Sequence, residues 1–336
     1  MNGDFAPRVQ KDVISCKLSY GIFCYQTYLI CLTAESKNKN SGCKSIINSV
    51  KKGDNKNLST YIRREQLDGL EIFAGSFENY IFKPHFHECY TVIFVQEGIG
   101  DYSTKNKQLV VPQGSMLILT PYQVHTGRSK DGSRWRFLTA YIPQRLVETA
   151  YRQFLGLTPE DSDVKPYFNE NKFDSSELFD LGLEIFTELL ENSNPSGAKA
   201  QLDLFLKVLF QAGQEVNKLE DQQGRRESVN LVKDYLHEHY AEEISIEHLC
   251  DLSGLTEFSL IKSFKKYFEL PPHQYLINLR VEKAKQLLKQ PSPSTHIAYE
   301  VGFYDQSHFI RHFKNIVGVT PKKFKDQKFS STYAFK

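Results

Sequence analysis

Short apolar runs alternate with turn residues from about residue 67 to residue 142. The runs are rich in β-branched and aromatic residues, and Gly, Pro and Asn separate them. Examples are residues 70–77, 90–98, 107–121 and 135–143. Runs this short, with no long helical period between them, are typical of an antiparallel sandwich or barrel. We therefore expect a β-barrel over residues 65–150.

The pattern changes to helical spacing after residues 158–175, a loop rich in Asp, Pro and Asn. Two apolar stripes with steps of three and four follow; they comprise Leu178, Leu181, Ile185 and Leu189, and then Leu202, Phe205, Leu206 and Leu209. Such stripes predict a helical hairpin, within a helical region at residues 151–221. Each stripe can pack against the barrel or pair with its copy in a homodimer, and we expect some role in a homodimer.

Residues 1–64 are expected to be an N-terminal extension, partly flexible. Within it, residues 34–60 are rich in Lys, Asn, Ser and Gly and have little apolar periodicity, as in a flexible linker. A start codon assigned too far upstream would also produce such a segment. Residues 20–34 are apolar but too short and too polar to span a bilayer, so we expect no membrane segment.

Charge divides the chain more clearly than its net value of +2 suggests. Residues 65–224 carry 14 Lys and Arg against 23 Asp and Glu, whereas residues 225–336 carry 17 against 13 and seven of the ten His. This division places the attraction for phosphate in the last third of the chain, although a solvated basic face without a partner has the same composition.

Two helix-turn-helix patterns lie in this basic part. In the first, Ser245 can cap a short helix, Gly254 gives the tight turn, and Thr256 caps a second helix with a buried stripe. About fifty residues later the pattern repeats, with Gly302 at the turn and Asp305 as the cap. A repeated pattern is much more specific than a single one.

The segment between the two patterns predicts one long helix over residues 271–290, beginning at prolines. We call the second helix of each pattern its reading helix. A rigid helix between the patterns fixes the distance between the two reading helices. Both can then enter the major groove about 34 Å apart on one face of double-stranded DNA. We expect this DNA-binding domain at residues 229–328, after a linker at 222–228 and before a tail at 329–336.

The reading helices expose polar faces as well as basic ones. The predicted DNA-binding residues are Glu257, Phe258, Ile261, Lys262, Lys265, Gln306, Ser307, His308, Arg311, His312 and Lys314. Arg311 suits a guanine edge and Gln306 suits adenine, whereas lysines such as Lys314 suit phosphates. Phe258 and Ile261 can only touch thymine methyl groups, so direct specificity is expected mainly from the second helix.

Residues 228–326 resemble the C-terminal part of the AraC family of transcription regulators. The resemblance rests on the Gly-Phe turn, the Asp-x-Ser-x-Phe cap, the Phe-Lys pair and the Gly-x-Thr-Pro ending within residues 297–325, and on residues 253–268. It implies an activator or repressor that binds DNA. It also implies contacts to bases or phosphates at the positions of Phe258, Ile261 and Lys262, and of Gln306, Ser307, His308 and Arg311.

Residues 82–102 and 111–127 resemble the cupin-like effector-binding domain found at the N-terminus of many such regulators. The resemblance implies a small-molecule effector bound in the barrel. Pockets for small molecules combine apolar walls with a few convergent polar groups. The predicted effector-binding residues are His85, His87, Tyr90, Tyr102, His125, Trp135 and Arg136.

Three histidines that face a barrel interior can also bind a divalent metal, as in enzymatic cupins. However, Thr91 and Val92 stand where those enzymes have a glutamate ligand, and Leu117 stands in the place of a further histidine. We therefore expect neither a metal nor another cofactor.

The fold class predicted for the whole chain is α+β multidomain: an antiparallel cupin-like β-barrel, a helical hairpin, and an all-α domain with two helix-turn-helix units. The favoured function is effector-responsive transcription regulation in the cytoplasm, without enzyme activity. The alternatives are a cupin-type metalloenzyme with an appended basic module and a constitutive DNA-binding protein with a vestigial barrel. No phosphate-binding loop, dinucleotide turn or serine-histidine-acid order supports an enzyme.

Overall fold

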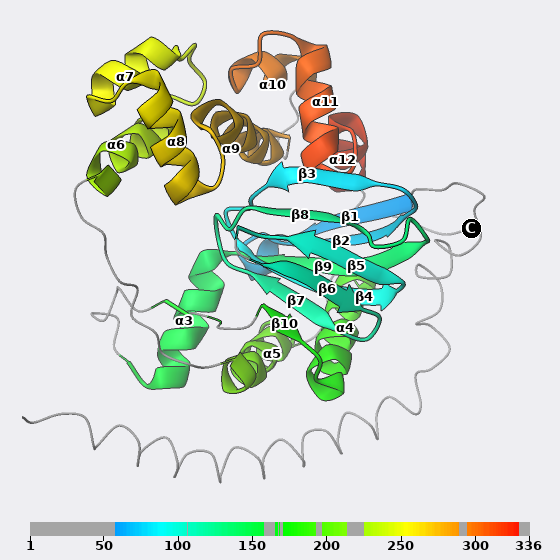
Figure 1. The fold of residues 1–336 in the computed structure, drawn as a ribbon. Helices are drawn as coiled ribbons and strands as arrows, with labels where there is room; N and C mark the ends of the chain where they lie inside the picture. The colour runs from blue at the N-terminus through cyan, green and yellow to red at the C-terminus, as the bar shows by residue number, and fades with distance from the viewer. Residues whose placement is uncertain are drawn as a thin grey trace, which may run out of the picture. The chain divides into compact units, whose positions relative to one another are not determined.

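The computed structural model describes residues 58–105, 107–157, 165–166, 168, 171–192, 197–213, 225–288 and 294–328. All described residues belong to the second of the two units into which the chain divides, residues 55–336. The expected extension before residue 58, residues 222–224 of the expected linker and the tail at 329–336 lie outside the described residues. Residues 225–228 were also assigned to the linker, but they begin helix α6 (Arg225–Glu238). Figure 1 shows the elements of the second unit.

Ten strands form two antiparallel sheets in the described part of the chain. They are β1 (Leu58–Arg64), β2 (Leu70–Phe77), β3 (Ile81–His85), β4 (Tyr90–Glu97), β5 (Ile99–Ser103), β6 (Gln108–Pro112), β7 (Met116–Leu119), β8 (His125–Ser129), β9 (Trp135–Ile142) and β10 (Lys172–Phe173). A short 3₁₀ turn, η1 (Glu65–Leu67), joins the first two strands. One sheet has the order β1-β2-β9-β4-β7-β10 and the other β3-β8-β5-β6, which confirms the antiparallel prediction.

The strand β1 corrects the expected start of the barrel. Residues 58–64 were assigned to the extension, but they pair in register with residues 70–76 of β2. The segment looked polar because an edge strand needs few apolar residues. Tyr61 is its fully buried aromatic residue, at 1% exposure.

Strand β4 is buried on both faces. Its sequence is therefore a continuous apolar run, without the alternation of apolar and polar residues that a strand with one exposed face shows. Thr91 and Ile93 face the space between the sheets, while Phe94 faces the opposite way. The ring of Phe94 lies 5.8, 5.7 and 6.1 Å from those of Phe179, Phe186 and Phe205, which come from two helices. The outer face of the six-stranded sheet is therefore covered by helices.

These helices are α3 (Gln144–Leu155), α4 (Ser176–Glu191) and α5 (Ala198–Gly213). The pair α4 and α5 confirms the predicted helical hairpin, and every residue of its two predicted stripes is buried. Because the stripes are buried within one chain, their role is to pack against the sheet and against each other. Helix α3 begins at residue 144, earlier than the expected helical region, directly after β9 ends.

The C-terminal helices are α6 (Arg225–Glu238), α7 (Ile246–Ser253), α8 (Glu257–Phe268), α9 (Pro272–Leu287), α10 (Ser294–Glu300), α11 (Gln306–Val317) and α12 (Pro321–Lys328). The side chains of Ser245, Thr256 and Asp305 accept hydrogen bonds from backbone N–H groups at the starts of α7, α8 and α11, as predicted. Helices α7 and α8 form the first helix-turn-helix unit, and α10 and α11 form the second. Helix α9 confirms the single long helix between them.

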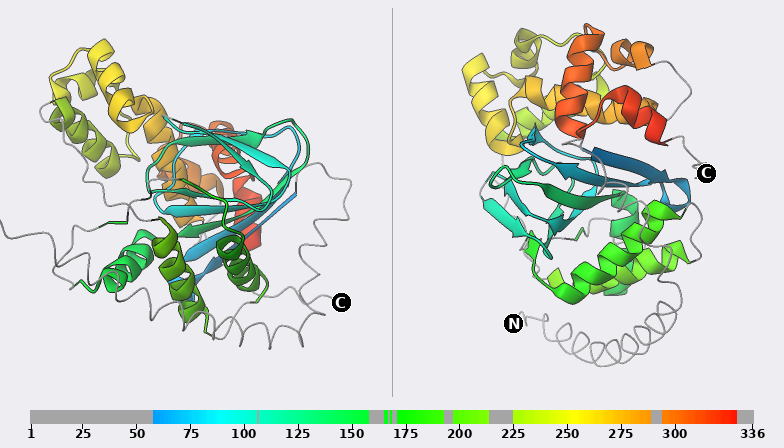
Figure 2. Two further views of the ribbon diagram at one scale, coloured as in Figure 1. Left: turned by 60° about the horizontal axis from the view of Figure 1, so that its bottom comes forward. Right: turned by 90° about the vertical axis from the view of Figure 1, so that its right-hand side faces the viewer.

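The C-terminal helices pack against the strands at the edge of both sheets (Figure 2). Helix α11 contacts β3, and α12 contacts β1. One hydrophobic core runs through this boundary, with Phe73, Phe82 and Phe137 from the strands and Phe313 and Phe324 from the helices. Because the core is shared, the helix-turn-helix part is held against the barrel by apolar burial.

Candidate functional site

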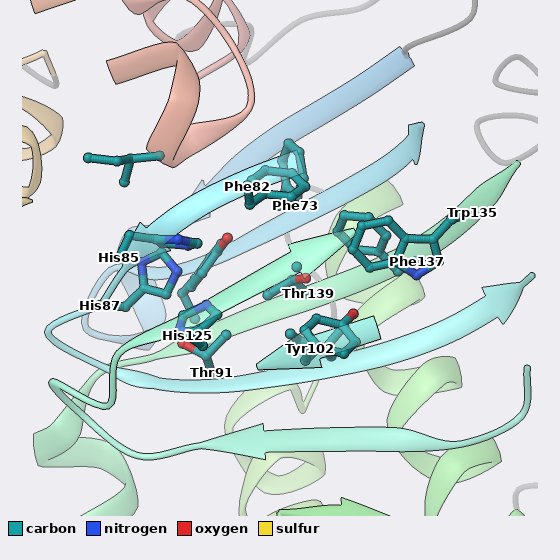
Figure 3. Close-up of a pocket in the computed structure, with 14 residues that line it drawn as sticks. Phe73, Phe82, His85, His87, Thr91, Tyr102, His125, Trp135, Phe137 and Thr139 are labelled. Atoms are coloured by element: carbon teal, nitrogen blue, oxygen red, sulfur yellow. The ribbon is translucent and has the colours of Figure 1, made fainter. Parts of the chain in front are cut away.

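A cavity lies between the two sheets. Its volume is about 30 Å³, counted as the space open to water-sized molecules, and one side of it is open. Its lining residues are Phe73, Phe82, His85, His87, Thr91, Ile93, Tyr102, His125, Gly127, Trp135, Phe137, Thr139, Tyr141 and Ile316. The imidazoles gather at one end, while Trp135 and Phe137 lie at the other (Figure 3). The cavity therefore has a polar end and an aromatic end.

The structure brings together five of the seven residues predicted to bind an effector: His85, His87, Tyr102, His125 and Trp135. Tyr90 and Arg136 do not line the cavity. Successive side chains of a strand point to opposite faces, and the cavity takes Thr91 and Ile93 from β4 and alternate residues from Trp135 to Tyr141 of β9.

The two excluded residues have other contacts on the opposite face. Tyr90 packs against Phe168, with ring centroids 6.5 Å apart. Arg136 pairs with Glu97, with Nη2 and Oε2 3.4 Å apart. Both were predicted to bind an effector from their residue types alone, without knowledge of which face of the strand each side chain occupies.

The three histidines converge from two neighbouring strands of the smaller sheet. His85 ends β3 and is paired in register with His125, which begins β8, and His87 follows in the loop after β3. The ring centroids of His85 and His125 are 4.2 Å apart, those of His85 and His87 are 4.8 Å apart, and those of His87 and His125 are 5.3 Å apart. All three residues are at most 5% exposed.

Burial keeps these imidazoles neutral. It is the largest cause that lowers the pKa of each, to about 4 for His125. The charges of neighbouring histidines lower the pKa of His85 further, and the charge of Lys285 does so for His87. Neutral imidazoles offer one donor and one acceptor nitrogen each.

The aromatic end of the cavity holds two polar atoms whose hydrogen-bonding capacity is unused. Among the described residues, neither Trp135 Nε1 nor the hydroxyl of Tyr102 has a hydrogen-bond partner, although both are buried. Their rings meet edge to face, with centroids 5.6 Å apart. Since an unpaired buried polar group destabilises the fold, these two atoms are natural contacts for a bound molecule.

The second reading helix completes the cavity wall. Ile316, in the last turn of α11, lines the cavity and is 5% exposed. Beside it, Gly318 lies so close to Phe82 that an added Cβ atom would be 2.9 Å from that ring. The hydroxyl of Tyr80 donates a hydrogen bond of 2.7 Å to the carbonyl of Lys314. A molecule in the cavity would therefore touch the helix that was predicted to read DNA.

A buried polar cluster joins α9 to the barrel next to the histidines. The Nζ of Lys285 donates to Oε2 of Glu282 at 3.0 Å and lies 3.8 Å from Oε2 of Glu71 in β2. Oε1 of Glu282 is 3.3 Å from Nδ1 of His87. Burial alone would lower the pKa of Lys285, but the two carboxylates raise it above its ordinary value. The sequence did not reveal this cluster, because Glu71 and His87 lie about 200 residues before Glu282 and Lys285 along the chain.

The predicted DNA-contact residues lie on the two reading helices. Glu257, Phe258, Lys262 and Lys265 of α8 are exposed, and so are Ser307, Arg311 and Lys314 of α11. Ile261, Gln306, His308 and His312 are half-buried. Phe258 is 75% exposed, and Nζ of Lys262 lies 5.8 Å from the centre of its ring. Tyr304, at 92% exposure before α11, is a further candidate that the sequence pattern did not single out.

Comparison with known protein families identifies both parts of the chain. Residues 69–206 match the AraC-like ligand binding domain, and residues 249–327 match a helix-turn-helix domain. The chain belongs to the AraC family of transcription regulators. The strand-rich part is therefore the ligand-binding domain, and the C-terminal helices are the DNA-binding domain, of one regulator.

Two similar proteins align with this chain over most of their own length. The HTH-type transcriptional regulator YbfI of Bacillus subtilis is 29% identical over 250 residues, which cover 73% of this chain and 89% of YbfI. The transcriptional activator RhaS of Pectobacterium carotovorum is 24% identical over 251 residues, covering 74% of this chain and 89% of RhaS. Both relatives carry the names of HTH-type transcriptional regulators.

The fold of this AraC-family regulator is similar to that of ToxT from Vibrio cholerae, in a crystal structure with an unsaturated fatty acid bound. The TM-score is 0.50, the sequences are 14% identical, and the alignment covers 84% of this chain and 99% of ToxT. The similarity supports the order of an antiparallel sheet domain followed by a helical domain. Among the described residues of the regulator, no helix has the length and apolar character needed to cross a membrane.

Proposed function

We propose that a small molecule bound in the barrel cavity controls how this regulator binds DNA, through the last turn of α11. The observation that carries the proposal is Ile316, because it lies in the second reading helix and also lines the cavity. A ligand that contacts Ile316 has a different affinity for the docked and undocked arrangements of α11. Such a difference is what couples an effector to DNA binding.

The cavity favours a molecule with an apolar body and a polar end. Phe73, Phe82 and Phe137 supply apolar walls, while Tyr102 and Trp135 offer unused donors and the histidines lie at the opposite end. The fatty acid bound to ToxT has this general character. We infer that the effector is a compact amphipathic compound rather than a highly charged one.

The proposed DNA contacts are those of the exposed face of each reading helix. Arg311 and Gln306 are proposed to read bases, and Lys262, Lys265 and Lys314 are proposed to contact phosphates. The side chain of Arg311 is exposed, whereas Phe309 and Phe313 of the same helix are fully buried and hold it in place. This separation of faces allows α11 to contact DNA with one side while its C-terminal end contacts the cavity.

We further propose that the regulator acts in the cytoplasm, as a homodimer and by binding rather than by catalysis. On helix α5, Leu204 and Val208 are only half-buried, and a second copy can cover them. The proposed domains are the barrel from residue 58 to residue 142, the helical region from residue 144 to residue 213, and the DNA-binding domain from residue 225 to residue 328. Light scattering of the purified full-length protein tests the dimer.

A DNA-binding titration tests the proposed function. The full-length protein is titrated against the promoter region beside its own gene at two salt concentrations, with and without pools of small metabolites. We expect specific binding that one pool shifts at least fivefold. In Ile316→Ala the shift should be largely lost, while Leu231→Ala, a substitution at a 55% exposed position on α6, should keep it. Specific binding that no pool changes would contradict the proposed control by an effector.

A further inference from the structure

In each of the three cavity histidines, the Nδ1 atom faces a hydrogen-bond acceptor. Nδ1 of His85 lies 2.6 Å from the carbonyl oxygen of Lys83, and Nδ1 of His125 lies 3.1 Å from that of Gln123. A carbonyl oxygen can only accept, so Nδ1 carries the proton in both rings. In a neutral imidazole this leaves Nε2 with an unshared electron pair.

His87 has the same arrangement, with a different acceptor. Its Nδ1 faces the carboxylate of Glu282 at 3.3 Å, and both side chains are buried. The carboxylate also accepts from Lys285, so it is charged and favours a proton on Nδ1 of His87. All three rings are thus held in the tautomer that leaves Nε2 free to act as a ligand.

The three side chains offer ligand atoms that lie within 4.8 Å of one another. Among the described residues, no donor is hydrogen-bonded to any of the three Nε2 atoms. Zinc binds imidazole nitrogen at about 2.0–2.1 Å, which places ligand nitrogens roughly 3.4 Å apart in a tetrahedron. Small rotations of the rings, by about 1 Å at the nitrogens, would close the set around one ion.

Contrary to the expectation from the sequence, we propose that His85, His87 and His125 bind one zinc ion through their Nε2 atoms, with Glu282 of α9 orienting His87 from the DNA-binding domain. Histidine ligands of metals usually donate their second N–H to a carboxylate or a backbone carbonyl, and all three rings do so here. Three neutral imidazoles without a thiolate suit Zn²⁺ better than Mg²⁺ or Ca²⁺. The ion lies at the polar end of the cavity, with its fourth position open.

Glu282 makes the site depend on both domains. It belongs to α9, between the two helix-turn-helix units, while the three ligands belong to the barrel. Removing such an orienting partner typically weakens metal affinity about 10- to 100-fold. Zinc affinity should therefore fall when Glu282 is altered, although Glu282 is not itself a ligand.

Zinc titration of the full-length protein tests the proposal. The protein is treated with EDTA, exchanged into chelator-free buffer, and titrated with zinc sulfate by calorimetry, and the retained metal is counted by mass spectrometry after gel filtration. We expect one zinc per chain. His125→Ala should weaken the affinity more than 100-fold, and His125→Gln, which preserves much of the side-chain volume, serves if the alanine variant does not fold. Glu282→Gln should still bind one zinc, with about 10- to 100-fold lower affinity.

His312→Ala is the matched control. It removes one member of a different histidine pair, His308 and His312, whose ring centroids are 4.4 Å apart on α11. Its zinc affinity should equal that of the wild type. Absence of stoichiometric zinc in the wild type, or equal binding by folded His125 variants, would overturn the site. Equal affinity of Glu282→Gln would overturn the part assigned to α9.

Discussion

Lys285→Met tests whether the buried polar cluster holds the DNA-binding domain on the barrel. Lys285 is 4% exposed and lies between Glu282, at 3.0 Å, and Glu71, at 3.8 Å. At an effective dielectric constant of about 20, these distances correspond to attractions of roughly 5 and 4 kcal/mol, which the desolvation of three charges largely offsets. Methionine preserves most of the side-chain volume but removes the positive charge.

The expected result is a large loss of stability, because the buried carboxylate of Glu282 loses its cation and Glu71 loses one of its two, keeping Arg63, whose Nη1 lies 3.3 Å from Oε1 of Glu71. Breaking a buried ion pair by removing one partner costs about 3–5 kcal/mol. For a unit of this size, 3 kcal/mol lowers the melting midpoint by roughly 6–12 °C. Urea and thermal unfolding of the full-length protein, followed by circular dichroism, measure the change.

A compensated variant separates the charge effect from a packing effect. Lys285→Met combined with Glu282→Gln and Glu71→Gln removes the unpaired charges as well, so it should recover most of the lost stability. Lys283→Met on the same helix is the control, since its partner Glu88 lies at 3.3 Å in a more exposed pair, and it should change stability by about 1 kcal/mol or less. A loss below 1 kcal/mol in Lys285→Met, or no recovery in the triple variant, would refute the reasoning.

Three further predictions concern DNA reading, acid stability and the helical layer. Arg311→Ala should weaken specific DNA binding by about 1–3 kcal/mol and relax the preference at one base position. Lys314→Ala should weaken binding to all DNA sequences alike and flatten its salt dependence. An equal loss of affinity for operator and random DNA in Arg311→Ala would disprove its role as a base reader. Burial lowers the pKa of His125 to about 4 from 6.5, so its contribution to stability is present above pH 6.5 and is lost as the pH falls toward 4. In EDTA-treated protein this should remove roughly 2 kcal/mol between pH 7 and pH 5, and urea unfolding of His125→Gln should show a correspondingly smaller pH dependence. Phe205→Ala should destabilise the protein by about 3–5 kcal/mol, because Phe205 is fully buried against Phe94 and Phe186. Lys207→Ala, at an exposed position of the same helix, is the control. A similar loss of stability in both variants would contradict the assigned packing.

Local sequence signals determined the secondary structure and the family. The caps Ser245, Thr256 and Asp305 lie where a side-chain oxygen is followed by an apolar stripe, and the structure confirms all three. Capping and periodicity depend on residues within one or two turns, so a single sequence contains the information. The same local character explains the correct prediction of the hairpin α4–α5 and the long helix α9.

The sequence predicted only in part which side chains of a strand face the cavity. His85, His87 and His125 were predicted together as histidines that face the barrel interior, and all three line the cavity, although His87 lies in the loop after β3. Tyr90 and Arg136 were chosen for their chemistry, but a shift of one residue moves a side chain to the other face of the sheet. Strand β1 was missed because an edge strand of polar residues carries a weak apolar pattern.

Only the tertiary structure decided how the two halves of the regulator meet. The sequence by itself determined an antiparallel barrel, a helical hairpin, two capped helix-turn-helix units and a set of candidate contacts, because those depend on neighbouring residues. It did not determine that Ile316 of α11 closes the barrel cavity, or that Lys285 and Glu282 of α9 meet Glu71 and His87. Contacts across about 200 residues arise from packing and charge pairing between surfaces that have no shared local pattern, and therefore only the folded chain brings them together.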